Sequence, residues 1–274
     1  MKFFVFCLLL FPFSVSSQKI SIDLYAGLAN YQGDLLSKRL SLNNSNPAFG
    51  LGLSYNYSEK ISARLFGTYT NLQGSDATNT DFNYRNLSFK TRILEAQANI
   101  QYNFVSTSDY IISPYIFAGV AIFNFNPWTT DISGNKYFLQ PLGTEGQGLE
   151  RYPDKKIYKL TQAAIPFGGG FTTEISSEFH IGIEINLRKV FTDYLDDVSG
   201  NYADSSYLAN NRSLISSKLA FRGNELINGQ NYPPEGAQRG NPKSKDWYYT
   251  TVIRLSYFLG SNGNKSKKLG CPSF

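Results

Sequence analysis

The sequence is poor in the residues that most often carry chemistry. Its 274 residues include one histidine, His180, and two cysteines, Cys7 and Cys271. Cys7 lies in an apolar run at the start of the chain, so Cys271 is the one thiol expected in an exported form. One thiol cannot close an internal disulfide, so Cys271 is either free in a tail or linked to another chain. A serine-type triad would have to use His180 at a predicted strand end, where an interfacial histidine is the simpler interpretation. We therefore predict a protein that is not an enzyme.

Beyond its first residues, the sequence has no run of about 18 apolar residues of the kind a transmembrane helix needs. Its 42% hydrophobic and 17% charged residues and its mean hydropathy of -0.28 would suit an ordinary soluble domain. The start of the chain indicates export, because Lys2 precedes an apolar run over 3–13 and small residues over 15–17. This pattern predicts a secretory signal peptide over 1–17, cleaved after Ser17. Any membrane crossing must then be made by strands.

Large apolar side chains alternate with small or polar ones in long stretches. In PAFGLGLSYNY, residues 47–57, Phe49, Leu51 and Leu53 alternate with glycine and serine. This period of two predicts strands. The eight predicted strands are 20–31, 47–57, 61–71, 90–104, 113–125, 161–175, 179–191 and 247–259. They exceed the five or six residues of a usual soluble strand and reach the roughly 9 to 11 that a tilted membrane strand needs.

The connections between these strands alternate in length. Three are short, at 58–60, 105–112 and 176–178, and four are long, at 32–46, 72–86, 126–160 and 192–246. Outer-membrane barrels have tight periplasmic turns and long outer loops, and an even strand count leaves both termini in the periplasm. The sequence therefore predicts an all-β fold, an eight-stranded antiparallel transmembrane β-barrel over 18–260, with a periplasmic tail over 261–274. In a closed barrel every backbone group is paired, and the outer face can be apolar because it contacts outer-membrane lipids.

A soluble barrel of the lipocalin type is the competing fold, and it would place the apolar rows inside. The signal peptide, the strand lengths and the loop asymmetry favour the membrane form. An eight-stranded barrel is narrow enough to be filled by its own side chains, so a diffusion pore is not expected. We predict a paired network of inward charges, since unpaired charges are not tolerated in such an interior. Its predicted members are Arg64, Arg92, Glu95, Glu184, Arg188 and Arg254.

Several loop motifs have a chemical and a structural interpretation. Asp193, Asp196 and Asp197 could bind calcium, but their spacing lacks the EF-hand pattern, so loop capping is expected. GTEGQG at 143–148 lacks the ending and context of a phosphate-binding loop, so we predict no nucleotide and no other cofactor or metal. The glycines at 168–170 indicate close approach by a plug or an inward loop.

In the longest loop, Leu208, Ile215 and Leu219 lie at helical spacing, and Gly223 could end the helix. A small helix that caps the barrel mouth is the simpler interpretation, and a surface on which a partner docks is the alternative.

The predicted tail carries Lys265, Lys267 and Lys268 beside Cys271. A solvated basic tail is the simplest interpretation. In the periplasm the tail could also contact peptidoglycan, anionic headgroups or an acidic protein. Nucleic acid is not expected as a partner in that compartment.

Four stretches resemble the PorG family of Bacteroidota outer-membrane proteins. They are LQPLGTEGQGL (139–149), AIPFGGGF (164–171), FTDYLDDVSGNYAD (191–204) and CPSF (271–274). The resemblance runs through nearly the whole mature chain. It implies an eight-stranded barrel of the type IX protein secretion system, associated with the periplasmic ring of the PorK lipoprotein and PorN. In many relatives this apparatus also serves gliding motility. The resemblance supplies no catalytic residues.

Two functions of different classes follow from these patterns. The first is a component that anchors a periplasmic assembly, which the basic tail and Cys271 favour. The second is a barrel whose outer loops bind an external ligand or surface, which the length of 126–160 and 192–246 favours. A lipid-modifying enzyme or a protease is a distant third.

Overall fold

Eight long antiparallel strands close into a barrel. The structure is a computed structural model that describes residues 20–36, 44–78, 82–106 and 110–259. The barrel strands are β1 (Ile20–Gln32), β2 (Asn46–Asn56), β3 (Ile61–Ser75), β4 (Ser88–Asn103), β5 (Ser113–Asn124), β8 (Thr161–Glu174), β9 (Phe179–Val190) and β10 (Trp247–Phe258). Their order is β3-β2-β1-β10-β9-β8-β5-β4, and pairing of β3 with β4 closes the cylinder. The predicted fold is confirmed.

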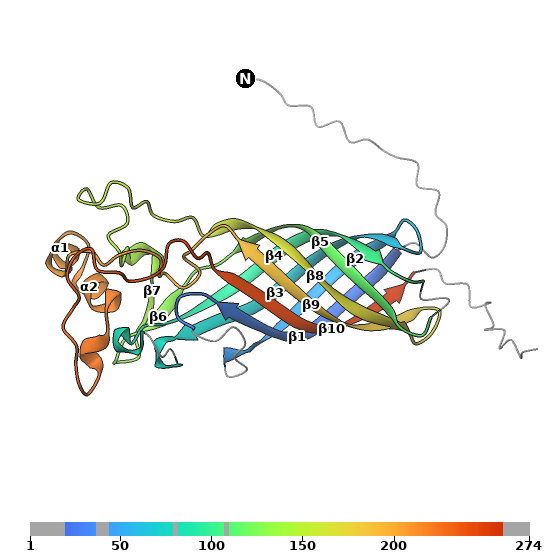
Figure 1. The fold of residues 1–274 in the computed structure, drawn as a ribbon, viewed down its shortest axis with the longest axis horizontal. Helices are drawn as coiled ribbons and strands as arrows, with labels where there is room; N and C mark the ends of the chain where they lie inside the picture. The colour runs from blue at the N-terminus through green and yellow to red at the C-terminus, as the bar shows by residue number, and fades with distance from the viewer. Residues whose placement is uncertain (1–19, 37–43, 79–81, 107–109, 260–274) are drawn as a thin grey trace, which may run out of the picture.

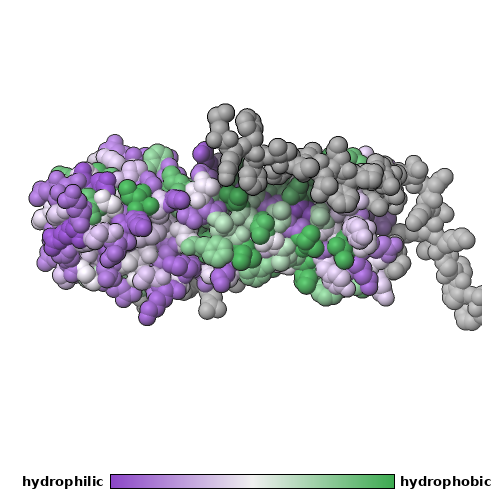
Figure 2. Space-filling model, turned by 90° about the horizontal axis from the view of Figure 1, so that it is seen from above, coloured by the Kyte–Doolittle hydropathy of each residue, from purple (hydrophilic) through white to green (hydrophobic). Residues whose placement is uncertain are grey.

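The side-chain alternation sets which face of each strand points outward. Leu51 and Leu65 are 60% and 62% exposed, whereas Phe66, the residue after Leu65 on β3, is 3% exposed. The apolar rows therefore lie outside, which excludes the lipocalin arrangement. The outward apolar row of β4 runs from Leu94 to Tyr102 and is continued by Phe104 directly after the strand. A tilted segment of that length covers roughly 25 Å of membrane. Figure 2 shows the hydrophobic side chains gathered over the barrel and hydrophilic ones over one end.

The long connections fold together at one end of the barrel, and we call this body, with residues 33–36, 76–78, 82–87, 125–160 and 191–246, the cap. It contains a hairpin, β6 (Trp128–Thr130) and β7 (Lys136–Phe138), which extends the sheet from β4. Its helices are α1 (Ser205–Asn211) and α2 (Leu214–Ala220). Short 3-10 turns are η2 (Asp76–Thr78), η3 (Asn83–Arg85), η4 (Gln140–Leu142) and η5 (Gly223–Glu225).

The start of β1 and the end of β10 lie at the end of the barrel opposite the cap (Figure 1). There the amide of Leu259 donates to the carbonyl of Ile20 at 2.9 Å. The predicted signal peptide (1–17), its cleavage site at Ser17 and the predicted tail with Lys265, Lys267, Lys268 and Cys271 lie outside the described residues. No helix in the described ranges combines the length and the apolar character that crossing a bilayer requires.

A hydrophobic core joins the cap to the barrel. From the strands it takes Ile93, Phe123 and Val190, and from the cap it takes Leu195, Val198 and other buried residues. The rings of Phe125, Tyr158 and Tyr194 stack in series, at centroid distances of 6.1 and 4.7 Å. Because the same core continues from the lumen into the cap, the cap closes this end of the barrel.

Candidate functional site

The first charge cluster of the lumen is centred on Glu184 of β9. Its carboxylate accepts hydrogen bonds from Arg64 at 2.8 Å and from the hydroxyl of Tyr115 at 3.0 Å. Arg254 lies 3.8 Å from the same carboxylate. Both arginines also donate to the side-chain oxygen of Gln101, at 2.9 and 3.0 Å. Side chains from β3, β5 and β10 thus converge on one buried carboxylate of β9.

The second cluster pairs Arg188 of β9 with Glu95 of β4. The guanidinium and the carboxylate are 3.0 Å apart, and both side chains are fully buried. The hydroxyl of Tyr248 donates to Glu95 at 2.5 Å, and Arg188 also donates to Thr250 at 2.7 Å. Such a pair is tolerated inside a protein because its remaining hydrogen-bonding groups are also satisfied.

The buried lumen is balanced in charge. Three arginines, Arg64, Arg188 and Arg254, face three acids, of which two are Glu95 and Glu184. The third is Asp23, which accepts hydrogen bonds from Ser54 and Ser256. The sequence analysis did not predict Asp23 as a member of this network. Its position between the outward residues Ile22 and Leu24 places its side chain on the inward face of β1.

Arg92 does not belong to this network, contrary to the prediction. It is exposed and shares the outward face of β4 with Leu94. Successive residues of a strand point to opposite faces, so a residue three positions from Glu95 must face the other way. Its position directly beyond the apolar row is that of an interfacial cation.

Aromatic rings fill the space around the lumen charges. The guanidinium of Arg64 lies 4.6 Å from the ring centroid of Phe66 and 4.9 Å from that of Phe117. A Cβ on Gly168 would lie 2.0 Å from the carbonyl oxygen of Ile185 and 2.9 Å from the Phe117 ring. The glycines at 168–170 therefore make room for a neighbouring strand and for rings of β5. The plug or inward loop expected there is wrong, because the approaching groups belong to the barrel wall.

The cap is organised around the buried carboxylate of Glu145. It accepts the backbone amides of Ser199 and Gly200 at 2.9 and 3.1 Å, and it pairs with Arg239 at 2.9 Å. The loop that carries Glu145 needs glycine at position 146, where φ is +88° and a Cβ would meet the Tyr152 ring at 2.4 Å. GTEGQG thus presents an anion to backbone amides, the opposite of a phosphate-binding loop.

The three aspartates of the 191–204 stretch are buried in the cap. Asp197 accepts hydrogen bonds from Thr144 at 2.5 Å and Tyr158 at 2.7 Å. Asp193 accepts one from Ser199 at 2.7 Å. Asp196 lies 2.5 Å from the hydroxyl of Tyr31, at the end of β1. Each aspartate therefore binds loop or strand groups, and no set of three metal-binding side chains occurs in the described parts of the chain.

Burial makes several acids of the cap weaker. It raises the pKa of Asp193 and that of Asp197 to about 6, although hydrogen bonds from Ser199 and the charge of Arg239 oppose the rise. The pKa values of Asp196 and Asp246 lie well above their usual range for the same reason, and neighbouring carboxylates raise them further. Proton binding by these acids therefore favours the folded cap.

The longest loop forms two short helices where the sequence predicted one. Leu208 and Leu219 are buried as the spacing suggests, but the helix is broken because Ser213 caps a new one by accepting the Ser216 amide at 3.1 Å. Asp204 caps the first helix. Gly223 does not end the second helix, which stops at Ala220 and leaves Gly223 to begin η5.

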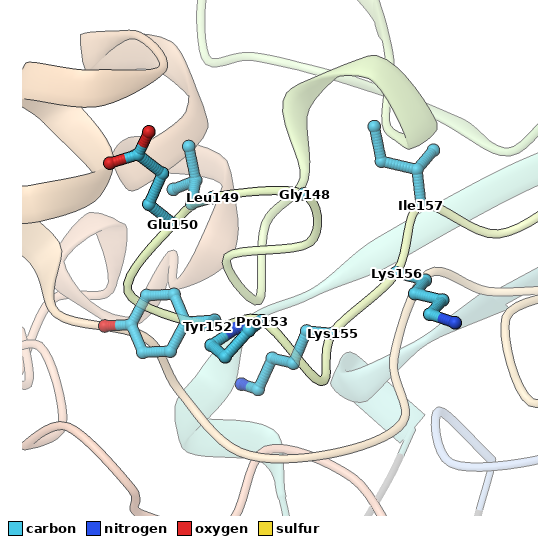
Figure 3. A pocket seen from close by; sticks show the side chains of 8 residues that line it. All are labelled: Gly148, Leu149, Glu150, Tyr152, Pro153, Lys155, Lys156 and Ile157. Carbon is cyan, nitrogen blue, oxygen red and sulfur yellow. The ribbon is translucent and has the colours of Figure 1, made fainter.

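A shallow hollow of about 410 Å³ lies on the cap beside the Glu145 loop. Figure 3 shows the charged ends of Glu150 and Lys156 pointing away from each other. The ammonium of Lys155 is already bound to the carbonyls of Glu145 and Asn201, both at 2.8 Å, and burial lowers its pKa. The hollow has no converging polar groups, so it is not a candidate binding site.

His180 of β9 pairs across the sheet with Ser256 of β10, whose hydroxyl donates to Asp23. His180, near the end of the barrel opposite the cap, packs on the Phe258 ring at 4.4 Å. This ring contact joins β9 to β10, and within the described residues His180 makes no hydrogen bond to Ser256 or Asp23 of the kind a general base needs. The geometry supports a filled barrel, one end of which is closed by an internally bonded cap.

Comparison with known proteins gives a family and a fold. The family described as "Domain of unknown function (DUF6089)" matches residues 1–213. This span includes Glu145 together with Ser199 and Gly200, whose backbone amides its carboxylate accepts. A search of curated proteins finds no match.

Among solved structures, the chain is similar to Ail of Yersinia pestis in complex with a heparin analogue, at 9% identity and a TM-score of 0.43, covering 89% of this chain and 99% of Ail. It is also similar to Neisserial surface protein A, at 8% identity and a TM-score of 0.43, covering 87% and 96%. The outer-membrane enzyme PagL matches at 12% identity and a TM-score of 0.34, covering 86% and 98%.

Proposed function

We propose that this chain, which belongs to the DUF6089 family, is a non-enzymatic outer-membrane component of the type IX protein secretion apparatus. Its periplasmic side would contact the ring of the PorK lipoprotein and PorN. The proposal is supported by the resemblance of four stretches to the PorG family. Two of those stretches, 139–149 and 191–204, contact each other where Glu145 accepts the amides of Ser199 and Gly200. The resemblance therefore includes residues at the structural centre of the cap.

The position of the chain ends is the observation that carries this proposal. β1 begins and β10 ends side by side at the end of the barrel opposite the cap (Figure 1). Residues 261–274, with Lys265, Lys267, Lys268 and Cys271, follow β10 in the sequence. With the cap outside the cell, both termini and this basic segment belong to the periplasm, where the ring would be contacted.

The sealed lumen favours a scaffold over a conduit. Paired charges occupy the interior at Glu95 and Glu184, and the hydrophobic core closes the cap end. An exported protein could pass through the lumen only if the charge pairs and the core at the cap end were both disrupted. A barrel of this kind contributes by holding a periplasmic assembly to the outer membrane.

Co-purification in mild detergent tests the proposal. Recovery of PorK and PorN with the full chain is expected, together with a reductant-sensitive adduct that Cys271→Ser removes. A variant in which Lys265, Lys267 and Lys268 become Gln should recover less of the ring, while Lys60→Gln, in a turn at the same end of the barrel, should recover as much as the wild type. Isolation of the barrel alone under these conditions would refute the anchoring role.

The folded structure of the cap favours a second candidate function, which is binding of an external ligand or surface. The cap has its own buried centres, and Leu214 and Ile132 are 63% and 81% exposed on it. Under this alternative, the double substitution Leu214→Ser and Ile132→Ser would weaken binding to the external ligand or surface, whereas the tail variants would leave that binding unchanged.

A further inference from the structure

A polar hollow of about 240 Å³ lies where the cap meets the outward face of the barrel. Its walls come from the ends of β3 and β4 and from β6, and they include Gln73, Ser75, Ser88, Lys90, Trp128 and Thr129. Hydroxyl, amide and ammonium groups thus surround one indole ring. Aspartate and glutamate are absent from the described lining. Such a site favours an anion that carries hydroxyl groups or other polar substituents.

Two ammonium groups are brought to the same ring beside this hollow. Lys136 Nζ lies 4.1 Å and Lys90 Nζ 5.7 Å from the centroid of Trp128. The pairing of Lys90 with Trp128 and of Trp128 with Phe138 fixes this arrangement in the sheet. Within the described residues, neither lysine has a carboxylate within ion-pair distance. Two like charges are thus held within about 10 Å of each other, an arrangement that an anionic group between them would stabilise.

The hollow lies directly beyond the apolar surface of the barrel. On the outward face of β4, Leu94 is followed toward the cap by Arg92 and then by Lys90. At about 3.3 Å per residue, the two cations stand roughly 7 and 13 Å along the strand from Leu94. Lys159 and Lys189 are exposed just beyond the outward apolar residues of β8 and β9. Cations at this depth are at the level of lipid headgroups.

The opposite end of the barrel has a different rim. Its described turns expose Tyr57, Ile111 and Ile175, and Lys60 is the one lysine or arginine in them. Among the described residues, the exposed lysines and arginines of the two rims are therefore concentrated at the cap end.

We propose that the hollow formed by β3, β4 and β6 binds a phosphorylated glycolipid of the outer leaflet. Lys90 and Lys136 would contact a phosphate, with Arg92 nearer the acyl chains. Trp128 would hold the two ammonium groups in place and pack against the sugar. The phosphate supplies the charge, and the apolar row that begins at Leu94 accommodates the lipid tails, which a free anion would not use.

The fluorescence of Trp128 provides a direct test. The full chain with Trp247→Phe has Trp128 as its one tryptophan and is titrated in detergent with bis-phosphorylated lipid A. Parallel titrations use dephosphorylated lipid A and inorganic phosphate. The variants are K90Q/K136Q, the charge-retaining K90R/K136R, and K60Q at the opposite rim as the matched control. Heat-modifiable migration in gels confirms that each variant is folded.

A saturable change in emission with phosphorylated lipid A is expected. Binding should weaken about tenfold or more in K90Q/K136Q, return in K90R/K136R and stay unchanged in K60Q. If K90Q/K136Q does not fold, the single variant K136Q in the exposed hairpin replaces it and should weaken binding severalfold. Equal affinity for dephosphorylated lipid A, or unchanged affinity in the lysine variants, would overturn the proposal. Inorganic phosphate that competes at equal strength would overturn the assignment to a lipid.

Discussion

Glu145 and Arg239 form a fully buried ion pair at 2.9 Å across 94 positions of sequence. The pair joins the 139–149 loop to the segment that leads into β10. Arg239 also donates to the backbone carbonyl of Asp197 at 2.6 Å. One ion pair thus ties together three segments of the cap.

The first prediction concerns this pair. Glu145→Gln leaves the buried Arg239 without its main partner and should destabilise the cap by about 3 to 5 kcal/mol. The rate of proteolytic cleavage within 192–246 measures the loss, and heat-modifiable migration of the barrel should be unchanged. The matched control is Glu235→Gln, which breaks the exposed pair with Arg151 and should cost at most about 1 kcal/mol. Equal effects of the two substitutions would contradict the central position of Glu145.

The second prediction is a pH dependence of the cap. Burial raises the pKa of the Asp197 carboxyl from 3.8 to about 6, so the folded cap binds the proton more tightly than the unfolded chain does. This stabilisation is fully present below about pH 4 and is lost as the pH rises through about 6. Asp193 acts in the same direction.

Cleavage within 192–246, divided by the rate on a denatured substrate at the same pH, should therefore be slower at pH 5 than at pH 7.5. Asp197→Asn should reduce this difference, while Asp154→Asn, at an exposed position, should leave it intact. A cap that becomes more resistant as the pH rises would contradict the assignment.

Two arginines of the barrel give a third prediction. Arg188→Gln uncouples Glu95 in the lumen and should lower the free energy of unfolding in vesicles by about 3 kcal/mol or more. Arg92→Gln, on the outward face of β4, should change it by less than about 1 kcal/mol. Urea unfolding followed by tryptophan fluorescence measures both. A larger effect of Arg92→Gln would mean that the lumen was assigned to the wrong face.

The filled lumen leads to a fourth prediction. The purified chain in a planar bilayer should show no steady ion conductance, because the Glu184 cluster and the core that closes the cap end occupy its cross-section. A porin reconstituted in the same way serves as the positive control. Long-lived open channels with the wild-type chain would show that the interior is not sealed.

The strands could be predicted from the sequence because their signal is local. A period of two over ten or more residues, as in 47–57, depends on which face meets lipid and on little else. The predicted strand limits agree with the structure to within four residues, as at the end of β3. The same period of two puts Asp23 on the inward face and Arg92 on the outward face.

The cap could not be predicted in the same way, because its contacts are long-range. Nothing in GTEGQG indicates that Glu145 accepts the amides of Ser199 and Gly200. The break between the two helices depends on one capping side chain, Ser213, within a spacing that suits a single helix. The hollow beside Trp128 requires β6 to pair with β4 at Lys90, which no periodicity marks.

The central claim is that lipid contacts the outward apolar rows. Nitroxide labels at single cysteines along 61–69, in a Cys271→Ser background and in lipid vesicles, test it through collision with oxygen and with a water-soluble nickel reagent. The label at Leu65 should be accessible to oxygen and protected from nickel, and the label at Phe66 should be protected from both, with the alternation continuing along β3. A label at Leu65 that is reached by the nickel reagent, or that is as protected from oxygen as the label at Phe66, would contradict the claim.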